Sequence, residues 1–150
     1  MPFEKATEEE LDNIYNVHFK GVFFLTQKLL PLINDGGRIV NISTAELASP
    51  RPEARLRLDE GSSRGAVEAY GKRTRPRRIA VNVVAPGATE TDFSGGIVRE
   101  NPVVNKRVAE GTAPGRAGVP DDIGRMIASL LSEDNRWIDA ECIEVTGGYV

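Results

Sequence analysis

The sequence feature that most constrains the fold is the run IAVNVVA at residues 79–85, in which Asn82 is the single polar side chain. A strand with one face in water alternates apolar and polar residues, whereas a strand covered on both faces is apolar almost throughout. The β-branched composition also favours a strand over a helix. Strands covered on both faces are typical of parallel sheets that lie between two layers of helices. Residues 79–85 therefore predict a strand that is covered on both faces, as in an α/β protein.

Two further strands are expected on either side of this run in the sequence. Residues 38–43 (RIVNIS) and 141–146 (ECIEVT) are short and rich in β-branched side chains. Helical patterns separate the strands, near residues 101–110 and over residues 120–131, where Asp121 and Asp122 favour a helix start through the helix dipole. The apolar face of this last helix is expected to comprise Ile123, Met126, Ile127 and Leu130.

The N-terminal part of the chain predicts a long helix over residues 7–33. Thr7 and Glu10 have the spacing of a capping box, in which each side chain pairs with the other residue's backbone N–H. Residues 34–37 (NDGG) end the helix, because glycine readily adopts the left-handed conformation that closes a helix. The predicted inward face of this helix comprises Leu11, Ile14, His18, Val22, Leu25 and Leu29.

Alternating strands and helices predict parallel strand pairing with crossover connections. We expect a single domain over residues 1–150 with an α/β, three-layer, mostly parallel sheet. Residues 45–78 interrupt this pattern, because they are rich in Arg and Pro and show helical periodicity only briefly. Pro76 and the like charges around it predict a poor helix at the end of this segment.

Composition excludes several classes of protein. The chain has one cysteine and one histidine, so we predict neither an internal disulfide nor a bound metal. No apolar run approaches the roughly 20 residues that span a bilayer, so no membrane partner is expected. The acidic, polar start of the sequence does not have the pattern of a secretory signal, and we predict a cytoplasmic protein.

Charge is unevenly distributed along the sequence. Residues 51–78 contain nine Arg and Lys against four Asp and Glu, a local charge of +5, and the other residues sum to −8. The basic segment has one aromatic residue, Tyr70, and no nucleic-acid-binding motif. We therefore interpret it as a solvated segment and predict no nucleic-acid partner.

Four segments, taken in order, resemble the short-chain dehydrogenase/reductase family. They are the helix with Lys20-Gly21-Val22-Phe23-Phe24, the GRIVNIS strand at residues 37–43, the N-x-V-x-P-G-x-x-x-T pattern at residues 82–91, and the closing segments at 115–123 and 143–148. The resemblance implies the second part of a Rossmann-like doubly wound fold. The family's Gly-rich phosphate-binding loop and its Asn-Asn-Ala-Gly turn have no counterpart here, so the fold is expected to lack the N-terminal phosphate-binding half.

The resemblance also implies a nicotinamide site. Pro86 and Gly87 are expected to shape a turn that approaches the ring, while the Thr89 backbone and the Thr91 hydroxyl contact the carboxamide. NAD and NADP both remain open as the cofactor, because the residue that distinguishes them belongs to the half with no counterpart. Residues 93–118 resemble the loop that covers the substrate. A Pro-Gly pair after a strand is, alternatively, only a turn.

Family members transfer hydride between nicotinamide and a carbonyl or alcohol carbon, with a Tyr-x-x-x-Lys pair that transfers the proton. The matching positions here hold Glu60 and Arg64. A glutamate beside an arginine is expected to be ionised at neutral pH, so it does not act as the weak acid. Arginine also does not replace the compact ammonium of lysine. Tyr70 does not restore the motif, because Thr74 lies four residues after it.

Two further positions of the family's catalytic tetrad are occupied by other residues. Thr44 stands at the serine position and keeps a hydroxyl. His18 stands at the asparagine position and either orders a water or is a partly buried residue on the inner face of the helix. The family also associates through its long helix, so a homo-oligomer through residues 7–33 is expected.

Three hypotheses about function follow from the sequence. The chain is an NAD(P)-dependent oxidoreductase acting on a small-molecule carbonyl or alcohol, although the missing motifs predict that it is inactive alone. Alternatively, it is a non-catalytic fragment or interaction module derived from this family. The third hypothesis is a frameshifted or truncated gene, because residues 45–78 have the Arg/Pro/Ala/Gly composition of GC-rich DNA read out of frame.

Overall fold

The computed structural model describes residues 5–44, 70 and 74–149. Within them, three parallel strands form a sheet in the order β1-β2-β3. These strands are β1 (Arg38–Ile42), β2 (Ala80–Pro86) and β3 (Cys142–Val145). All three strands predicted from the sequence are confirmed, with bounds that differ by at most one residue. Glu60 and Arg64 lie outside the described residues, as do most of residues 45–78.

β2 is the middle strand of the three, and it is covered on both faces, as its composition predicts. Val81, Val83 and Val84 are almost completely buried. β1 pairs with one edge of β2 from Arg38↔Ala80 to Ile42↔Val84, and β3 pairs with the other edge from Val83↔Cys142 to Pro86↔Val145. The carboxyl ends of the three strands therefore meet at one edge of the sheet.

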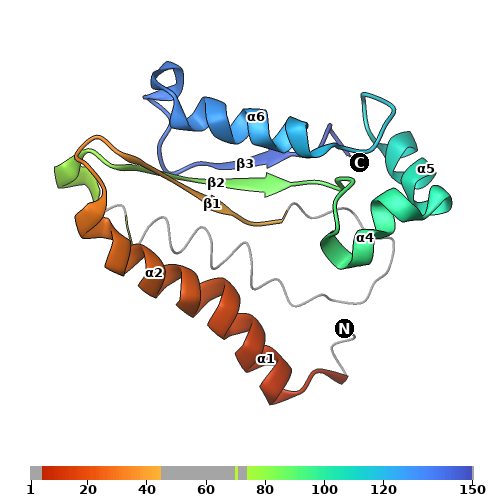
Figure 1. Cartoon of the computed structure of the whole chain (residues 1–150), viewed down its shortest axis with the longest axis horizontal. Coiled ribbons are helices and arrows are strands. Elements are labelled where there is room, and N and C mark those ends of the chain that lie inside the picture. Colours follow the sequence, from red (N-terminus) through yellow and green to blue (C-terminus); the bar gives the residue numbers. More distant parts are fainter. Residues whose placement is uncertain (1–4, 45–69, 71–73, 150) are drawn as a thin grey trace.

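Helices cover both faces of this sheet, which confirms the three-layer α/β prediction (Figure 1). The N-terminal helical segment lies below the sheet in this view, and α6 (Pro120–Leu131) lies above it. The predicted apolar face of α6 is turned inward: Leu130 is buried, and Ile123, Met126 and Ile127 are half-buried. α4 (Phe93–Glu100) and α5 (Pro102–Gly111) lie beyond the carboxyl ends of the strands.

The predicted N-terminal helix is confirmed as one nearly continuous helical segment with a change of winding in its middle. It consists of α1 (Glu8–Tyr15), the π-helical turn η2 (Asn16–Gly21), α2 (Val22–Leu29) and the 3₁₀ turn η3 (Leu30–Leu32). Both hydrogen bonds of the Thr7 and Glu10 capping box are present. Gly36 has a φ of +78° after the helix, as expected of a glycine that closes it.

The inward face of this helix differs from the predicted one. Leu25 and Leu29 are 59% and 43% exposed, and His18 is also exposed. Phe23 and Thr26 face the sheet instead, where Phe23 stacks on Tyr70. The π-helical turn changes the angle between successive side chains, so an ideal helical periodicity carried through it does not select Phe23 and Thr26 as the residues that face the sheet.

The end of the basic segment has a structural role. Arg75–Arg77 form a short 3₁₀ helix, η4, which agrees with the expectation that Pro76 disfavours a regular helix. The Arg77 guanidinium donates to the carbonyls of Leu30 and Ile33 and pairs with Asp35. Arg77 thus satisfies carbonyls that the end of the N-terminal helix leaves unpaired.

Candidate functional site

The candidate site lies at the edge of the sheet where the three parallel strands end. Thr44 follows β1, Gly87 follows β2 and Thr146 follows β3. In open α/β sheets, ligands bind beyond the carboxyl ends of the strands. The structure therefore brings the predicted cofactor residues and Thr44 to the same edge of the sheet.

Gly87 is pressed directly against the chain that follows β3. Its N–H donates to the carbonyl of Val145 at 2.9 Å. A Cβ atom added at Gly87 would lie 2.8 Å from the Cα of Thr146, closer than side-chain atoms normally approach. The glycine is therefore required by packing between two backbones, in addition to any approach to a ligand.

The predicted cofactor turn continues through residues 88–91 and is held by hydrogen bonds. The Thr89 hydroxyl donates to the Gly87 carbonyl at 3.0 Å. Gly118 exchanges backbone hydrogen bonds with this turn: its N–H donates to Ala88 and its carbonyl accepts from Glu90. The Thr91 hydroxyl accepts from the N–H of Phe93 at 3.2 Å, so its own proton is free to donate to a ligand.

The segment predicted to cover the substrate forms two helices tied to this turn. The Asn105 amide of α5 donates to the Glu90 carboxylate at 2.6 Å and to the Val98 carbonyl of α4 at 3.0 Å. Ser94, Gly95 and Gly96 all have a φ between +53° and +72°, which turns the chain sharply at the start of α4. Asn105 thus connects both helices of the covering segment to the predicted cofactor turn.

An ion pair fixes the other end of the covering segment. Arg116 makes two hydrogen bonds with the Asp122 carboxylate, at 2.7 and 2.9 Å. Asp122 also accepts from the N–H of Val119 at the start of α6. These contacts hold the pKa of Asp122 at about 2, below its ordinary value of 3.8, with the Arg116 hydrogen bonds as the largest cause.

Of the other positions that match the family's catalytic residues, the structure brings only some to the candidate site. Thr44 is exposed at the end of β1, beside the cofactor turn. His18 is exposed in the π-helical turn, so the interpretation of it as a partly buried residue is wrong. Tyr70 is 8% exposed in the core, where burial raises the pKa of its hydroxyl.

Sequence reasoning missed the residues that hold the turn in place. Gly118, Glu90 and Asn105 carry no motif of their own, and their roles depend on contacts between segments that are distant in sequence. The pairing of Arg116 with Asp122 had a detectable signal, because an arginine shortly before an acidic helix start is a common way to stabilise that start.

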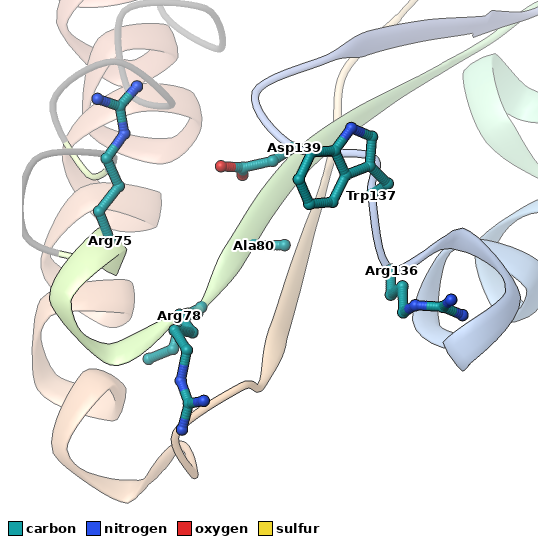
Figure 2. Close-up of a pocket in the computed structure, with 7 residues that line it drawn as sticks. Arg75, Arg78, Ala80, Arg136, Trp137 and Asp139 are labelled. Atoms are coloured by element: carbon teal, nitrogen blue, oxygen red, sulfur yellow. The ribbon is translucent and has the colours of Figure 1, made fainter.

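A hollow lies at the opposite end of the sheet from the candidate site, where β2 begins. It has a volume of about 320 Å³ and is lined by Arg75, Arg78, Ile79, Ala80, Arg136, Trp137 and Asp139. Figure 2 shows the guanidinium groups of Arg75, Arg78 and Arg136 directed away from one another, so they do not converge on one anion. Its position at the amino end of β2 also separates it from the candidate site.

The described residues contain no group of three or more His, Cys, Asp and Glu side chains that could bind a metal ion. In that same part of the chain, no helix has both the length and the apolar character needed to cross a membrane.

The fold and the site together define the class of protein: an α/β protein with a parallel sheet whose candidate ligand site lies at the carboxyl ends of the strands. Comparison with known proteins identifies the family. The sequence model of the family described as Enoyl-(Acyl carrier protein) reductase matches residues 1–150. The chain belongs to the short-chain dehydrogenase/reductase family.

Curated relatives match nearly the whole chain. The hydroxynaphthalene reductase-like protein Arp2 of Metarhizium brunneum is 31% identical over 163 aligned positions, which cover 99% of this chain and 60% of the relative. An uncharacterised oxidoreductase of Methylorubrum extorquens is 34% identical, covering 97% of this chain and 59% of the relative. The chain thus spans about 60% of the length of these relatives.

Solved structures agree with this assignment. The promiscuous reductase LugOII, which catalyses keto-reduction at C1 during lugdunomycin biosynthesis, is 32% identical with a TM-score of 0.86. The match covers 99% of this chain and 58% of LugOII. The angucycline C-6 ketoreductase LanV, solved with bound NADP, is 31% identical with a TM-score of 0.82, covering 97% and 56% of the two chains.

Proposed function

We propose that this chain carries the nicotinamide side of an NAD(P)-dependent oxidoreductase site that acts on a small-molecule carbonyl or alcohol. The observation that carries the proposal is the turn at Gly87, which lies at the carboxyl end of the central strand and is packed against Thr146. The Thr91 hydroxyl has a proton free to donate to a carboxamide oxygen. The similar protein LugOII catalyses keto-reduction, and the similar ketoreductase LanV was solved with bound NADP.

Pro86, Gly87, Thr89 and Thr91 are the residues that would hold the nicotinamide, and the cofactor would supply or accept the hydride. Thr44 is exposed at the same edge and would hydrogen-bond the substrate oxygen. His18 would order a water on the helical side. Glu60 and Arg64 occupy the positions of the proton-transferring pair, and neither has the chemistry of tyrosine or lysine.

These substitutions lead to the second part of the proposal: the chain by itself binds nicotinamide weakly and does not turn over substrate. A glutamate that is ionised at neutral pH has no proton to give to a developing alkoxide. The sequence also has no Gly-rich loop to bind the pyrophosphate, so the adenine half of the cofactor adds little to affinity.

Calorimetric titration of the folded chain tests the nicotinamide site. We expect NADPH and reduced nicotinamide mononucleotide to bind with similar affinity, and adenosine 2′,5′-bisphosphate not to bind. Thr91→Val keeps the shape of the side chain but removes the hydroxyl, so it weakens nicotinamide binding. Thr7→Val removes a hydroxyl at the distant start of α1 and leaves binding unchanged. A folded chain that binds neither nicotinamide compound contradicts the proposal.

The exposed apolar side chains of the N-terminal helical segment support a second function, that of an interaction module. Val17, Leu25 and Leu32 are 65%, 59% and 77% exposed, which is unusual for large apolar side chains gathered on one segment. We propose that this segment associates with a second copy of the chain.

An intact alternative reading frame across codons 45–78 would identify the chain as the product of a frameshifted gene.

A further inference from the structure

The side chain of Asn105 joins three separate parts of the chain. Its amide nitrogen donates to the Glu90 carboxylate of the predicted cofactor turn at 2.6 Å and to the carbonyl of Val98 in α4 at 3.0 Å. Asn105 itself belongs to α5, and both Asn105 and Glu90 are half-buried. One side chain, with both of its N–H donors in use, therefore connects the turn with both helices of the covering segment.

The Val98 carbonyl depends on this side chain for a donor. In a continued helix the N–H four residues further on would donate to it, but that residue is Pro102, which has no N–H. The second acceptor, the Glu90 carboxylate, makes a shorter and stronger hydrogen bond than a neutral oxygen does, which agrees with its 2.6 Å distance from Asn105.

The end of α4 that contains Val98 has few other attachments. Among the described elements, the main neighbour of α4 is α5, beside which it lies beyond the strand ends (Figure 1). The ion pair between Arg99 and Asp92 is exposed, and exposed pairs contribute little to stability. Gly96 is the buried residue of this helix. The place of this end of α4 therefore depends on α5 and on Asn105.

The far end of α5 is attached independently of Asn105. The ring of Tyr149 packs on Gly111, where an added Cβ would lie 2.6 Å from it. The N–H of Ala113 donates to the carbonyl of Gly147 at 2.9 Å. α5 is thus held by the chain that follows β3, and it provides a fixed support from which Asn105 reaches both α4 and the turn.

We propose that Asn105 is a positioning residue that couples the predicted cofactor turn to α4, so that nicotinamide bound at the turn and α4 stabilise each other. The identity of the ligand rests on the proposed function. Thr91, which would contact the carboxamide, directly follows Glu90, and its hydroxyl accepts from the N–H of Phe93 at the start of α4. A ligand that orders this turn also holds Glu90 toward Asn105, and by linkage the release of Glu90 weakens the binding of that ligand.

Hydrogen exchange of the whole chain without a ligand tests the link itself. Asn105→Ala removes both hydrogen bonds, so the amides of residues 93–100 should exchange about tenfold faster than in the wild type. Asn135→Ala is the matched control, because the Asn135 amide also donates twice, to the carbonyl and the hydroxyl of Ser129 in α6 at 2.9 and 2.6 Å. It should leave the exchange of residues 93–100 unchanged. Equal exchange of these residues in the two variants overturns the proposal.

Two substitutions of Glu90 separate this hydrogen bond from a general loss of stability. Glu90→Gln keeps a side-chain oxygen that accepts from Asn105, so exchange in residues 93–100 should stay close to that of the wild type. Glu90→Leu removes the acceptor, so exchange should rise toward that of Asn105→Ala. If Glu90→Gln exchanges as fast as Glu90→Leu, the hydrogen bond to Asn105 does not position α4.

Titration with reduced nicotinamide mononucleotide tests the coupling. Asn105→Ala should weaken its binding by about fivefold, and Asn135→Ala should leave it unchanged. The same compound should slow exchange in residues 93–100 of the wild type but not of Asn105→Ala. Equal affinity of the wild type and Asn105→Ala overturns the coupling. If the compound does not bind the wild type, the proposed function and the coupling fail together, while exchange without ligand decides separately whether Asn105 positions α4.

Discussion

Gly87 lies where the backbones that follow β2 and β3 approach each other most closely. The carbonyl of Val145 accepts from its N–H, and the Cα of Thr146 would lie 2.8 Å from an added Cβ. The Pro-Gly pair was predicted from the sequence as a turn near the cofactor. The contact with Thr146 was not predictable, because it joins two segments nearly sixty residues apart.

Gly87→Ala is predicted to destabilise the protein by about 1–3 kcal/mol, because the added methyl group forces two backbones apart. Gly124→Ala is the matched control: Gly124 lies within α6, and nothing lies within 4 Å of its added Cβ. That change should stabilise the protein by about 0.5–1 kcal/mol through helix propensity. Thermal unfolding should show a lower Tm for Gly87→Ala and a higher Tm for Gly124→Ala. Equal effects would mean that the contact at Thr146 is not a tight one.

His18 and Leu25 show the limit of residue-level prediction in a helix. The apolar spacing correctly predicts that the segment is helical, yet both side chains are exposed. A helical pattern with apolar residues on several sides does not specify which side faces the sheet. The pattern does not reveal the π-helical turn at Asn16–Gly21, which changes the side of the helix that faces the sheet after it.

At the scale of elements, α6 is the helix whose limits and inward face agree best with the sequence. Its amphipathic pattern is strong, and its start is marked by Pro120 followed by two acidic residues. Arg116 and Asp122 then join this start to the end of the covering segment. Local signals were sufficient here because the determinants of the helix lie within a few residues of one another.

The Arg116–Asp122 pair predicts a specific pH dependence of stability. The folded state holds the pKa of Asp122 at about 2, whereas the unfolded chain has the ordinary value of 3.8. The pair therefore stabilises the protein fully above pH 4, and this contribution is lost as the pH falls from about 4 to 2. We expect the difference in Tm between the wild type and Asp122→Asn to be largest at pH 6 and to shrink toward pH 3. A constant difference contradicts this account.

At the scale of the whole molecule, the N-terminal helical segment leaves large apolar side chains exposed on one side of the sheet. Leu11, Tyr15, Val17, Phe24, Leu25, Leu29 and Leu32 are all more than a third exposed. Composition alone does not reveal this surface, because the same residues were equally consistent with a buried inner face. We propose this segment as the contact between two copies of the chain.

Val17→Asp tests this contact by placing a charge on the exposed apolar segment. Val17 is 65% exposed, so the change has little effect on folding but disfavours burial against a second chain. Val103→Asp is the control, because Val103 is 78% exposed near the start of α5, away from the N-terminal helix. Light scattering after size-exclusion chromatography should show a smaller species for Val17→Asp alone. If wild type and both variants are monomers, the proposed contact does not exist.

The sequence by itself determined the α/β class, the three strands, the helices and the position of the turn that follows β2. These features depend on periodicity and on turn residues, which act over a few neighbouring positions. The tertiary structure alone decided which side of the N-terminal helix faces the sheet, how Asn105 and Gly118 hold the turn at residues 86–91, and which backbone Gly87 packs against. Each of these depends on contacts between distant segments, whose relative placement follows from the packing of the whole chain and not from any local pattern.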